Sequence, residues 1–430
     1  MTIEQKPERL TTPEVKIHDW DREGSEKLRK APFKLLDTTL RDGVQMPKIR
    51  QPSLAQKLQI IDYDAKVGFD AVDICMPGVR GRYYKEGVDC AKYIHKNHSN
   101  MEIVVLTRTI TDDVEATIDF AHEAQAPISV ILFRGSSDLR LLAEDWNQEQ
   151  IIQDMYRFSK QLVSQGLKVI SATEDTTRTR PEFLKRIFEA GIEGGATELC
   201  VADTVGYADP AGVEKQIRWV KREVRGAENM YLHYHGHNDT GNSVANTIAA
   251  IKAGDTIVGH GTWLGAGERA GNTPNESLLS DLERREIERY DISHVVQAAE
   301  VTSQAFNIPI PKNHPLVGEI VFTTMSGIHA AGTYKAMQKH IPDNHGGVYS
   351  AVSPIRVGRE NRYVIGTLSG KYSVMAVIED INKRLGLNLV YSDELALKLV
   401  KLANDINSSH LEDEDVIRIA EENGNGHLIE

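Results

Sequence analysis

Residues 230–239 read Met-Tyr-Leu-His-Tyr-His-Gly-His-Asn-Asp and join a short apolar run to the helical pattern of residues 244–251. Side chains on a strand alternate between its two faces, so His235 and His237 point the same way. Two imidazoles placed in this way can bind one divalent cation. The pair stands at the carboxyl end of the predicted strand, and in a barrel of parallel strands that edge carries the chemistry.

The same order of strand and helix recurs from residue 33 to residue 290. Eight short apolar runs predict strands at 33–40, 71–76, 103–107, 128–133, 167–172, 198–202, 230–235 and 256–262. Amphipathic stretches between them predict helices, among them 54–66, 112–124, 150–164, 181–190, 212–224 and 243–253. Eight strand–helix units within about 260 residues match an α/β fold of the (β/α)8 TIM-barrel type, whereas six units would favour a doubly wound sheet.

The pattern changes after residue 300. Residues 307–315 hold three prolines and read as a linker, and helical patterns follow at 373–385 and 393–407. We therefore expect four parts. These are an N-terminal arm over 1–30, the barrel over 31–300, a linker with a first subdomain over 301–365, and a small, mainly α-helical subdomain over 366–430.

Composition narrows the class of protein. The 430 residues are 40% hydrophobic and carry a formal net charge of −12, which argues against nucleic-acid binding. No apolar run approaches the roughly 20 residues that a membrane helix needs, and the polar N-terminus has no signal region. Three scattered cysteines without a CxxC pair argue against a disulfide framework or thiolate metal site and favour a reducing cytoplasm.

Asp42 is a third candidate metal ligand. It follows Arg41 at the end of the first predicted strand, where a carboxylate can bind a hard cation and a guanidinium can stabilise an oxyanion. Taken alone, this pair could equally close a βα loop as an ion pair. Together with His235 and His237 it favours a site for Mg, Mn or Zn with positions open for substrate and water. His233 shares their strand face but lies deeper, so we expect it in the core.

Three further segments carry polar or glycine-rich sequence. After the eighth strand, residues 265–272 read Gly-Ala-Gly-Glu-Arg-Ala-Gly-Asn, and such glycines let a backbone approach a ligand closely. In that loop Asn272 could supply a neutral oxygen to a metal or cap a helix. Glu174 and Thr204 follow the fifth and sixth strands and could contact substrate or be ordinary loop residues. His329 lies outside the barrel, where a structural role is favoured from the residues alone.

Three motifs together resemble a known family. Residues 37–43 read DTTLRDG, residues 235–239 read HGHND and residues 265–272 read GAGERAGN. In this order they resemble the metal-dependent TIM-barrel acyl-CoA condensing enzymes and lyases, which include the isopropylmalate, homocitrate and citramalate synthases and hydroxymethylglutaryl-CoA lyase. Segments 326–329, 349–354 and 365–370 resemble the subdomains that follow the barrel in α-isopropylmalate synthase and citramalate synthase. The chain is most similar to α-isopropylmalate synthase without its regulatory domain.

The resemblance implies an acyltransferase that condenses acetyl-CoA with a 2-oxo acid, with 2-oxoisovalerate favoured, to give 2-isopropylmalate and CoA in leucine biosynthesis. It implies the metal ligands Asp42, His235, His237 and Asn272. It implies the catalytic residues Arg41, Glu174, His329 and Tyr349, of which the last two reach the partner's active site in a homodimer. It places the 2-oxo acid against Arg41, Thr204 and Ser137, and acetyl-CoA near Gly265, Gly267 and Glu268.

The chain departs from the family pattern at several positions. Val44 and Asp73 stand where glutamate is usual, the histidine expected near Ile131 is missing, Ala172 stands where many synthases have a serine, and Thr367-Leu368 replaces Lys-His. Because the metal set is intact, we expect activity, but citramalate, homocitrate or citrate formation stay open as alternatives. A lyase is disfavoured because residues 265–272 hold no cysteine, and a non-catalytic descendant is the third alternative. With the chain ending at residue 430, we expect no leucine inhibition through a large allosteric domain.

Overall fold

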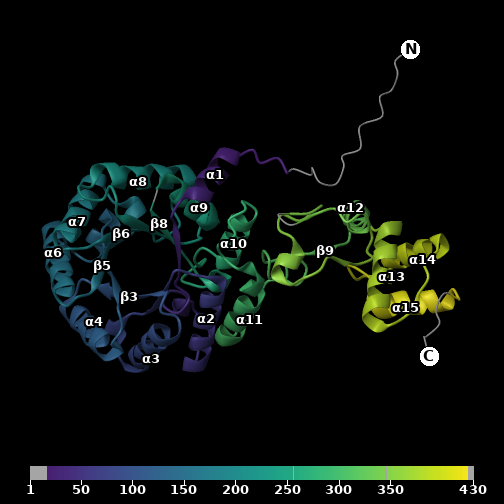
Figure 1. The fold of residues 1–430 in the computed structure, drawn as a ribbon, viewed down its shortest axis with the longest axis horizontal. Coiled ribbons are helices and arrows are strands. Elements are labelled where there is room, and N and C mark those ends of the chain that lie inside the picture. The colour runs from purple at the N-terminus through teal and green to yellow at the C-terminus, as the bar shows by residue number, and fades with distance from the viewer. Residues whose placement is uncertain (1–16, 255, 344–345, 425–430) are drawn as a thin grey trace, which may run out of the picture. The chain divides into compact units, whose positions relative to one another are not determined.

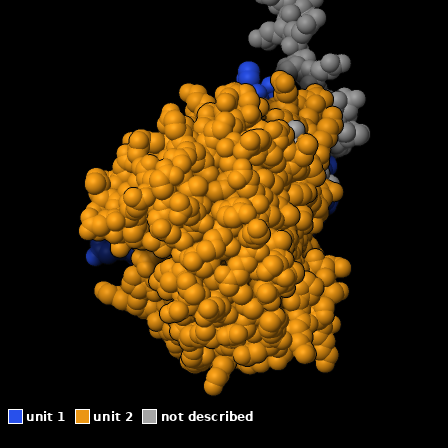
Figure 2. All heavy atoms as spheres, turned by 90° about the vertical axis from the view of Figure 1, so that its left-hand side faces the viewer, with its two compact units in different colours: residues 1–20, 311–430 blue, residues 21–310 orange. Residues whose placement is uncertain are grey.

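The computed structural model describes residues 17–254, 256–343 and 346–424. The chain divides into two compact units, one of residues 21–310 and one of residues 1–20 and 311–430. Figure 2 shows the first unit in orange and the second in blue. The boundaries expected at residues 300 and 365 stay predictions, and expectations for residues 1–16 and 425–430 lie outside the described residues.

The first unit is a closed barrel of eight parallel strands in sequence order, surrounded by helices (Figure 1). The strands are β1 (Lys34–Asp37), β2 (Ala71–Cys75), β3 (Glu102–Arg108), β4 (Ser129–Gly135), β5 (Lys168–Glu174), β6 (Glu198–Asp203), β7 (Tyr231–Gly236) and β8 (Ile257–Gly261). The helices are α1 (Arg22–Lys30), α2 (Leu54–Val67), α3 (Gly81–Asn97), α4 (Thr111–Ala124), α5 (Asp138–Ala143), α6 (Gln148–Ser164), α7 (Pro181–Glu193), α8 (Pro210–Glu223), α9 (Ser243–Ala253), α10 (Asn275–Glu283) and α11 (Val295–Phe306). The predicted (β/α)8 barrel is confirmed.

Local sequence signals explain where these elements begin and end. Helix α2 starts at a capping box, in which Ser53 and Gln56 each accept a hydrogen bond from the other's backbone N–H. It ends at Gly68, whose φ of +95° suits a residue without a Cβ atom. Because such signals are local, most observed boundaries lie within two or three residues of the predicted ones.

The first strand is shorter than predicted. β1 ends at Asp37 rather than at residue 40, because the carbonyl of Thr38 accepts the backbone N–H groups of Arg41 and Asp42. The Asp37 carboxylate also accepts hydrogen bonds from the backbone N–H and hydroxyl of Thr39, at 3.0 and 2.7 Å. These bonds turn the chain at the strand end and bring Arg41 and Asp42 to the mouth of the barrel.

The loop after β8 is anchored by Trp263. Its backbone N–H donates to the Thr39 hydroxyl at 2.8 Å, and its indole N–H donates to Asp64 at 2.7 Å. The next backbone N–H, of Leu264, donates to the Glu276 carboxyl at 2.7 Å. Burial raises the pKa of Glu276 to about 8, so this side chain is mostly protonated at neutral pH.

We predict that Glu276→Gln becomes progressively more stable than the wild type as the pH rises. The folded carboxyl, with its pKa of about 8, stays mostly protonated up to that pH, whereas in the unfolded chain it ionises near its ordinary pKa of 4.5. Between these two pKa values the free energy of unfolding of the wild type falls as the pH rises, by roughly 3 kcal/mol from pH 5 to pH 8. The amide of Glu276→Gln does not titrate, so the variant does not undergo this loss. Urea unfolding of both proteins at pH 5 and at pH 8 gives their difference in the free energy of unfolding. If this difference is the same at the two pH values, the buried Glu276 carboxyl is not neutral.

The second unit is mainly helical, as predicted for the C-terminal module. Its helices are α12 (Gly327–Gln338), α13 (Lys371–Leu385), α14 (Asp393–Asp405) and α15 (Asp413–Glu422), with short parallel strands β9 (Thr323–Thr324) and β10 (Arg362–Tyr363). Val374, Ile381, Leu395 and Leu399 are buried in a core that also includes Tyr363. Across the described ranges of both units, no helix combines the length and apolar character that crossing a bilayer requires.

Candidate active site

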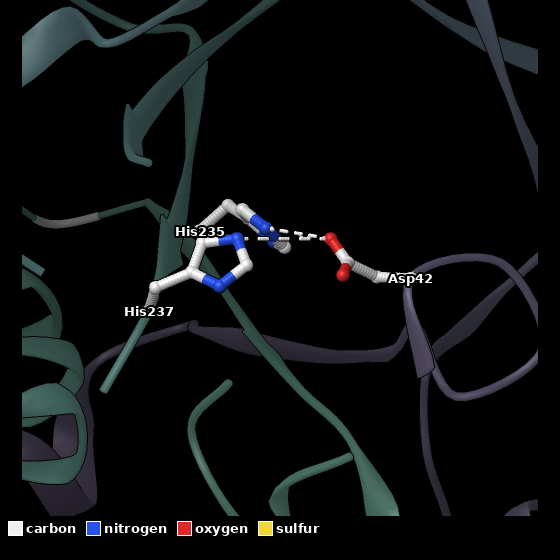
Figure 3. A group of neighbouring side chains, drawn as sticks. All are labelled: Asp42, His235 and His237. Carbon is white, nitrogen blue, oxygen red and sulfur yellow. Dashed lines mark ion pairs between the residues drawn. The ribbon is translucent and has the colours of Figure 1, made fainter. Parts of the chain in front are cut away.

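Three side chains converge at the carboxyl ends of β1 and β7. Asp42 comes from the turn after β1, and His235 and His237 come from β7 and the loop that follows it (Figure 3). The Asp42 Oδ2 lies 3.1 Å from His235 Nε2 and 3.9 Å from His237 Nε2. One ligand atom from each residue lies within 4.8 Å of the other two. The structure thus brings together the three ligands predicted from sequence.

The charges of these groups suit metal binding. Burial opposes ionisation of Asp42, but the Arg41 guanidinium and the two histidines hold its pKa well below the usual value. Burial, aided by neighbouring His235, lowers the pKa of His237 to about 4. Asp42 is therefore a carboxylate and His237 a neutral imidazole at neutral pH, which are the forms that bind metal ions.

Neighbouring groups orient the set further. His237 Nδ1 lies 3.2 Å from the carbonyl of Gly271, which holds the proton on Nδ1 and leaves the Nε2 lone pair toward Asp42. The Asn272 amide donates to Asp42 Oδ1 at 3.1 Å, while its own Oδ1 is buried without a partner. Two imidazoles and a carboxylate form a donor set that fits a divalent cation.

Gly267 is required by this packing. Its φ is +154°, and a Cβ atom there would lie 2.2 Å from Asn272 Nδ2 and 3.3 Å from Asp42 Oδ1. Any side chain at position 267 would therefore displace Asn272 or Asp42. Gly267, which the resemblance places near acetyl-CoA, thus lets the loop after β8 lie close to the candidate metal ligand Asp42 and to Asn272.

Arg41 is buried beside the metal set between two carboxylates. Its Nε donates to Asp73 at 2.7 Å and its Nη1 donates to Asp42 at 2.9 Å. Burial opposes its charge, but the two carboxylates raise the pKa of Arg41 above its usual value. Asp73, which departs from the family's glutamate, therefore still holds the guanidinium in place.

The three candidate metal ligands and Arg41 face a cavity of about 300 Å3. The cavity is lined by the predicted site residues Arg41, Asp42, Glu174, Thr204, His235, His237 and Glu268. Ile131 and Ala172, two of the departures from the family pattern, also line it. Ser137 does not: it is buried and its hydroxyl caps α5 by accepting the N–H of Arg140. Its predicted contact with substrate stays a prediction.

Glu174 and Thr204 reach the cavity from neighbouring strands. Burial raises the pKa of Glu174, although an ion pair with Arg140 at 3.0 Å opposes the shift. The Thr204 hydroxyl accepts the backbone N–H of Asp175 at 2.8 Å. Its own proton is therefore available to an acceptor in the cavity.

Sequence reasoning missed several lining residues, namely Met76, Leu106, Phe133, Cys200, His260 and Arg269. Strand alternation back from the strand ends could have indicated the apolar ones. His233, expected in the core, is 3% exposed and bonds His260 at 2.8 Å and Glu198 at 2.7 Å. Burial lowers the pKa of His260 well below its usual value.

His329 and Tyr349 belong to the second unit. Their rings stack with centroids 4.0 Å apart, and both residues are exposed. Tyr349 has a φ of +68°, a left-handed conformation that is uncommon for a residue with a side chain. The structure therefore brings these two predicted residues to each other, while their part in catalysis stays a prediction.

A closed (β/α)8 barrel with convergent charged residues at the carboxyl ends of its strands is typical of TIM-barrel enzymes. The chain belongs to the HMGL-like family, whose model matches residues 32–302.

Individual relatives extend the similarity beyond the barrel. A probable 2-isopropylmalate synthase of Archaeoglobus fulgidus is 31% identical over 82% of this chain and 66% of that protein. The homocitrate synthase of Sulfurisphaera tokodaii is 30% identical over 90% of this chain and 79% of that protein. The chain thus spans just under two thirds of the length of the Archaeoglobus relative. The crystal structure of Bacillus subtilis HMG-CoA lyase shares the fold, with a TM-score of 0.55 and 20% identity over 66% of this chain and 96% of that chain.

We predict that His237→Ala weakens Mn binding by more than about 100-fold, because even removing outer-shell partners of metal ligands costs about 10–100-fold. Calorimetric titration with Mn measures the effect. His98→Ala is the matched control, since His98 pairs with Asp62 on the helical layer, away from the cavity lining. Equal Mn affinity of the two variants would contradict the assignment of His237 as a ligand.

Proposed function

We propose that the protein is an acyltransferase of the 2-isopropylmalate synthase type, which condenses acetyl-CoA with a 2-oxo acid, most favourably 2-oxoisovalerate. The observation that carries the proposal is the buried set of Asp42, His235 and His237 beside Arg41 in one cavity. Relatives that are named 2-isopropylmalate synthase and homocitrate synthase support it. The corresponding setting is leucine biosynthesis in the cytoplasm.

Asp42, His235, His237 and Asn272 would hold a divalent metal ion, either Mg, Mn or Zn. When bound, such an ion supplies Lewis acidity toward the carboxylate and oxo oxygens of the 2-oxo acid. The remaining roles fall to groups of the chain itself. The Thr204 hydroxyl, whose proton is available, donates to the substrate carboxylate.

Arg41 stabilises the negative charge that develops on the oxo oxygen. Its guanidinium is buried and held by Asp73 and Asp42, so it is oriented before the reaction starts. In the reaction a base, proposed below to be His329, takes a proton from the acetyl methyl group. That carbon then bonds to C2 of the 2-oxo acid, and the former oxo oxygen takes up a proton to become a hydroxyl. Water then hydrolyses the thioester, which gives 2-isopropylmalate and free CoA.

The acetyl-CoA side of the cavity involves other residues. Glu174 lines the cavity and assists at the thioester, with a carboxyl whose pKa is raised by burial. Gly265, Gly267 and Glu268 lie along the loop where the thioester approaches, and Glu268 lines the cavity.

We propose further that the protein is a homodimer in which His329 and Tyr349 act in the partner's active site, with His329 as the base or water activator. Both residues are exposed, as are the apolar side chains of Ile328 and Leu368 on the same unit, at 75% and 73%. Exposed apolar side chains of this kind are typical of surfaces that become covered by another chain.

We predict that the protein with added Mn or Mg releases CoA from acetyl-CoA only when a 2-oxo acid is present. Removing the metal with a chelator should abolish the release, and Arg41→Ala should lower kcat by about 100–1000-fold, as loss of an oxyanion-stabilising donor does. A thiol reagent follows free CoA over time. No release with 2-oxoisovalerate, pyruvate, 2-oxoglutarate or oxaloacetate would overturn the proposed function.

We predict that two inactive variants, Arg41→Ala and His329→Ala, restore activity when they are mixed after co-refolding. A dimer with one chain of each kind has one intact active site if His329 acts in trans. Random pairing should then recover roughly a quarter of the wild-type kcat. No recovery, with mixed dimers present by native mass spectrometry, would contradict action across the subunits.

A further inference from the structure

The segment after β4 fixes the backbone of Glu174. Gly135, the last residue of β4, pairs in register with Glu174, the last residue of β5. The backbone N–H of Ser136, the next residue, donates to the Glu174 carbonyl at 3.1 Å, and Ser136 is buried. These contacts place the Glu174 backbone at the carboxyl edge of the barrel, so the direction of its carboxyl group depends on what the side chain contacts there.

The Glu174 carboxylate contacts the guanidinium of Arg140 on helix α5. Arg140 Nε lies 3.0 Å from Glu174 Oε1. The contact is an ion pair without the alignment of a hydrogen bond, so its attraction comes from charge. Glu174 lines the cavity and Arg140 does not, which means that Arg140 reaches the carboxylate from outside the cavity lining.

Arg140 is itself held in place by Gly135 and Trp146. A Cβ atom at position 135 would lie 2.7 Å from the Trp146 ring and 3.2 Å from Arg140 Cβ, so any side chain there would push one of them aside. The Trp146 ring attracts the guanidinium groups of Arg134 and Arg140, which lie 3.9 and 5.3 Å from its centre. The Trp146 backbone N–H donates to the Leu141 carbonyl at 3.0 Å and ties the ring to α5.

Arg140 also offsets the other effects on the Glu174 carboxyl. Burial has the largest effect and raises the pKa of Glu174, Arg140 lowers it, and the carboxylates of Asp175 and Glu144 raise it. Asp175 is bound by Arg178 at 2.8 and 2.7 Å, and Glu144 is bound by Arg140 at 3.2 Å. Arg140 therefore favours the carboxylate form at a position where burial and two like charges oppose it.

We propose that Arg140 is a positioning residue for the reaction: it holds the Glu174 carboxylate at the cavity wall, while Gly135 and Trp146 hold Arg140. This inference rests on the proposed function, in which Glu174 assists at the thioester, and it adds a residue that acts without touching substrate. The sequence does not reveal this role, because Arg140 lies on α5 and its partner ends the neighbouring strand β5.

The first test compares wild type, Arg140→Gln and Arg140→Lys by CoA release over a range of pH. Arg140→Gln should lower kcat by about 10-fold or more with little change in KM for the 2-oxo acid, since displacing a reacting group by about 1 Å can cost about 100-fold. One limb of the pH profile of kcat/KM should move to higher pH, because a carboxyl without its neighbouring cation ionises less readily. Arg140→Lys keeps the charge and should keep that limb near its wild-type pH. A loss of kcat without the shift, or no loss, overturns the proposal.

Arg180→Gln is the matched control. Arg180 pairs with Asp138, the first residue of α5, at 3.0 Å, so the variant removes an ion pair from the same helix. Both side chains are more than half exposed, and neither lines the cavity. Arg180→Gln should leave kcat and the pH profile as in the wild type. If it changes both as much as Arg140→Gln does, the effect belongs to α5 as a whole and the proposal fails.

Trp146→Leu tests whether the aromatic ring acts through Arg140. It should lower kcat in the wild type but add little to the loss in Arg140→Gln, because two changes to one interaction are not additive. If the two losses multiply in the double variant, Trp146 does not act through Arg140, and that part of the proposal is wrong.

Failure of the proposed function is distinguished by a titration that needs no turnover. Carbon NMR of the protein labelled at the glutamate carboxyl carbon follows Glu174, whose signal is identified by its absence in Glu174→Gln. Arg140→Gln should raise the pKa of Glu174, and Arg180→Gln should not. This result without CoA release would support the pairing with Arg140 and overturn only the condensation. An unchanged pKa of Glu174 in Arg140→Gln overturns the positioning role, whatever the activity.

Discussion

The buried carboxylate of Asp42 is the interaction on which the site depends. It accepts a hydrogen bond from Arg41 and lies 3.1 Å from His235, inside a barrel mouth where an unpaired charge would be costly. Each of these groups balances another: the carboxylate makes a buried guanidinium tolerable, and the guanidinium keeps the carboxylate ionised. The same arrangement presents a negative oxygen and two imidazoles to whatever enters the cavity.

The loops around this carboxylate are held by a second layer of contacts. Trp263 bonds Thr39, which belongs to the turn after β1, and so ties the loop after β8 to the turn that carries Asp42. Gly267 and Asn272 then pack directly against Asp42. These contacts join the turn after β1, the first strand, to the loop after β8, the last strand. Segments from the beginning and the end of the barrel sequence therefore meet at the candidate metal site.

Sequence reasoning located most of the barrel but not all of its detail. The apolar runs predicted all eight strands, since a two-residue or 3.6-residue period is a local property of the chain. β1 was predicted too long because the side-chain bonds of Asp37 to Thr39 end the strand inside an apolar run. The resemblance placed Ser137 against the substrate, and that contact stays a prediction. Its hydroxyl caps α5 in the structure, a contact that depends on the exact turn after β4 and that the sequence alone did not indicate.

The sequence by itself determined the alternation of strands and helices, the candidate ligands Asp42, His235 and His237, and the family that the motifs resemble. It could not say what faces those ligands, because proximity across a closed barrel depends on register and closure rather than on spacing along the chain. Only the tertiary structure decided that Asp73 holds Arg41, that the Asn272 amide donates to Asp42, and that Ile131 and Ala172 belong to one hydrophobic cluster inside the barrel. These contacts join residues from different strands, so they exist only once the barrel has closed.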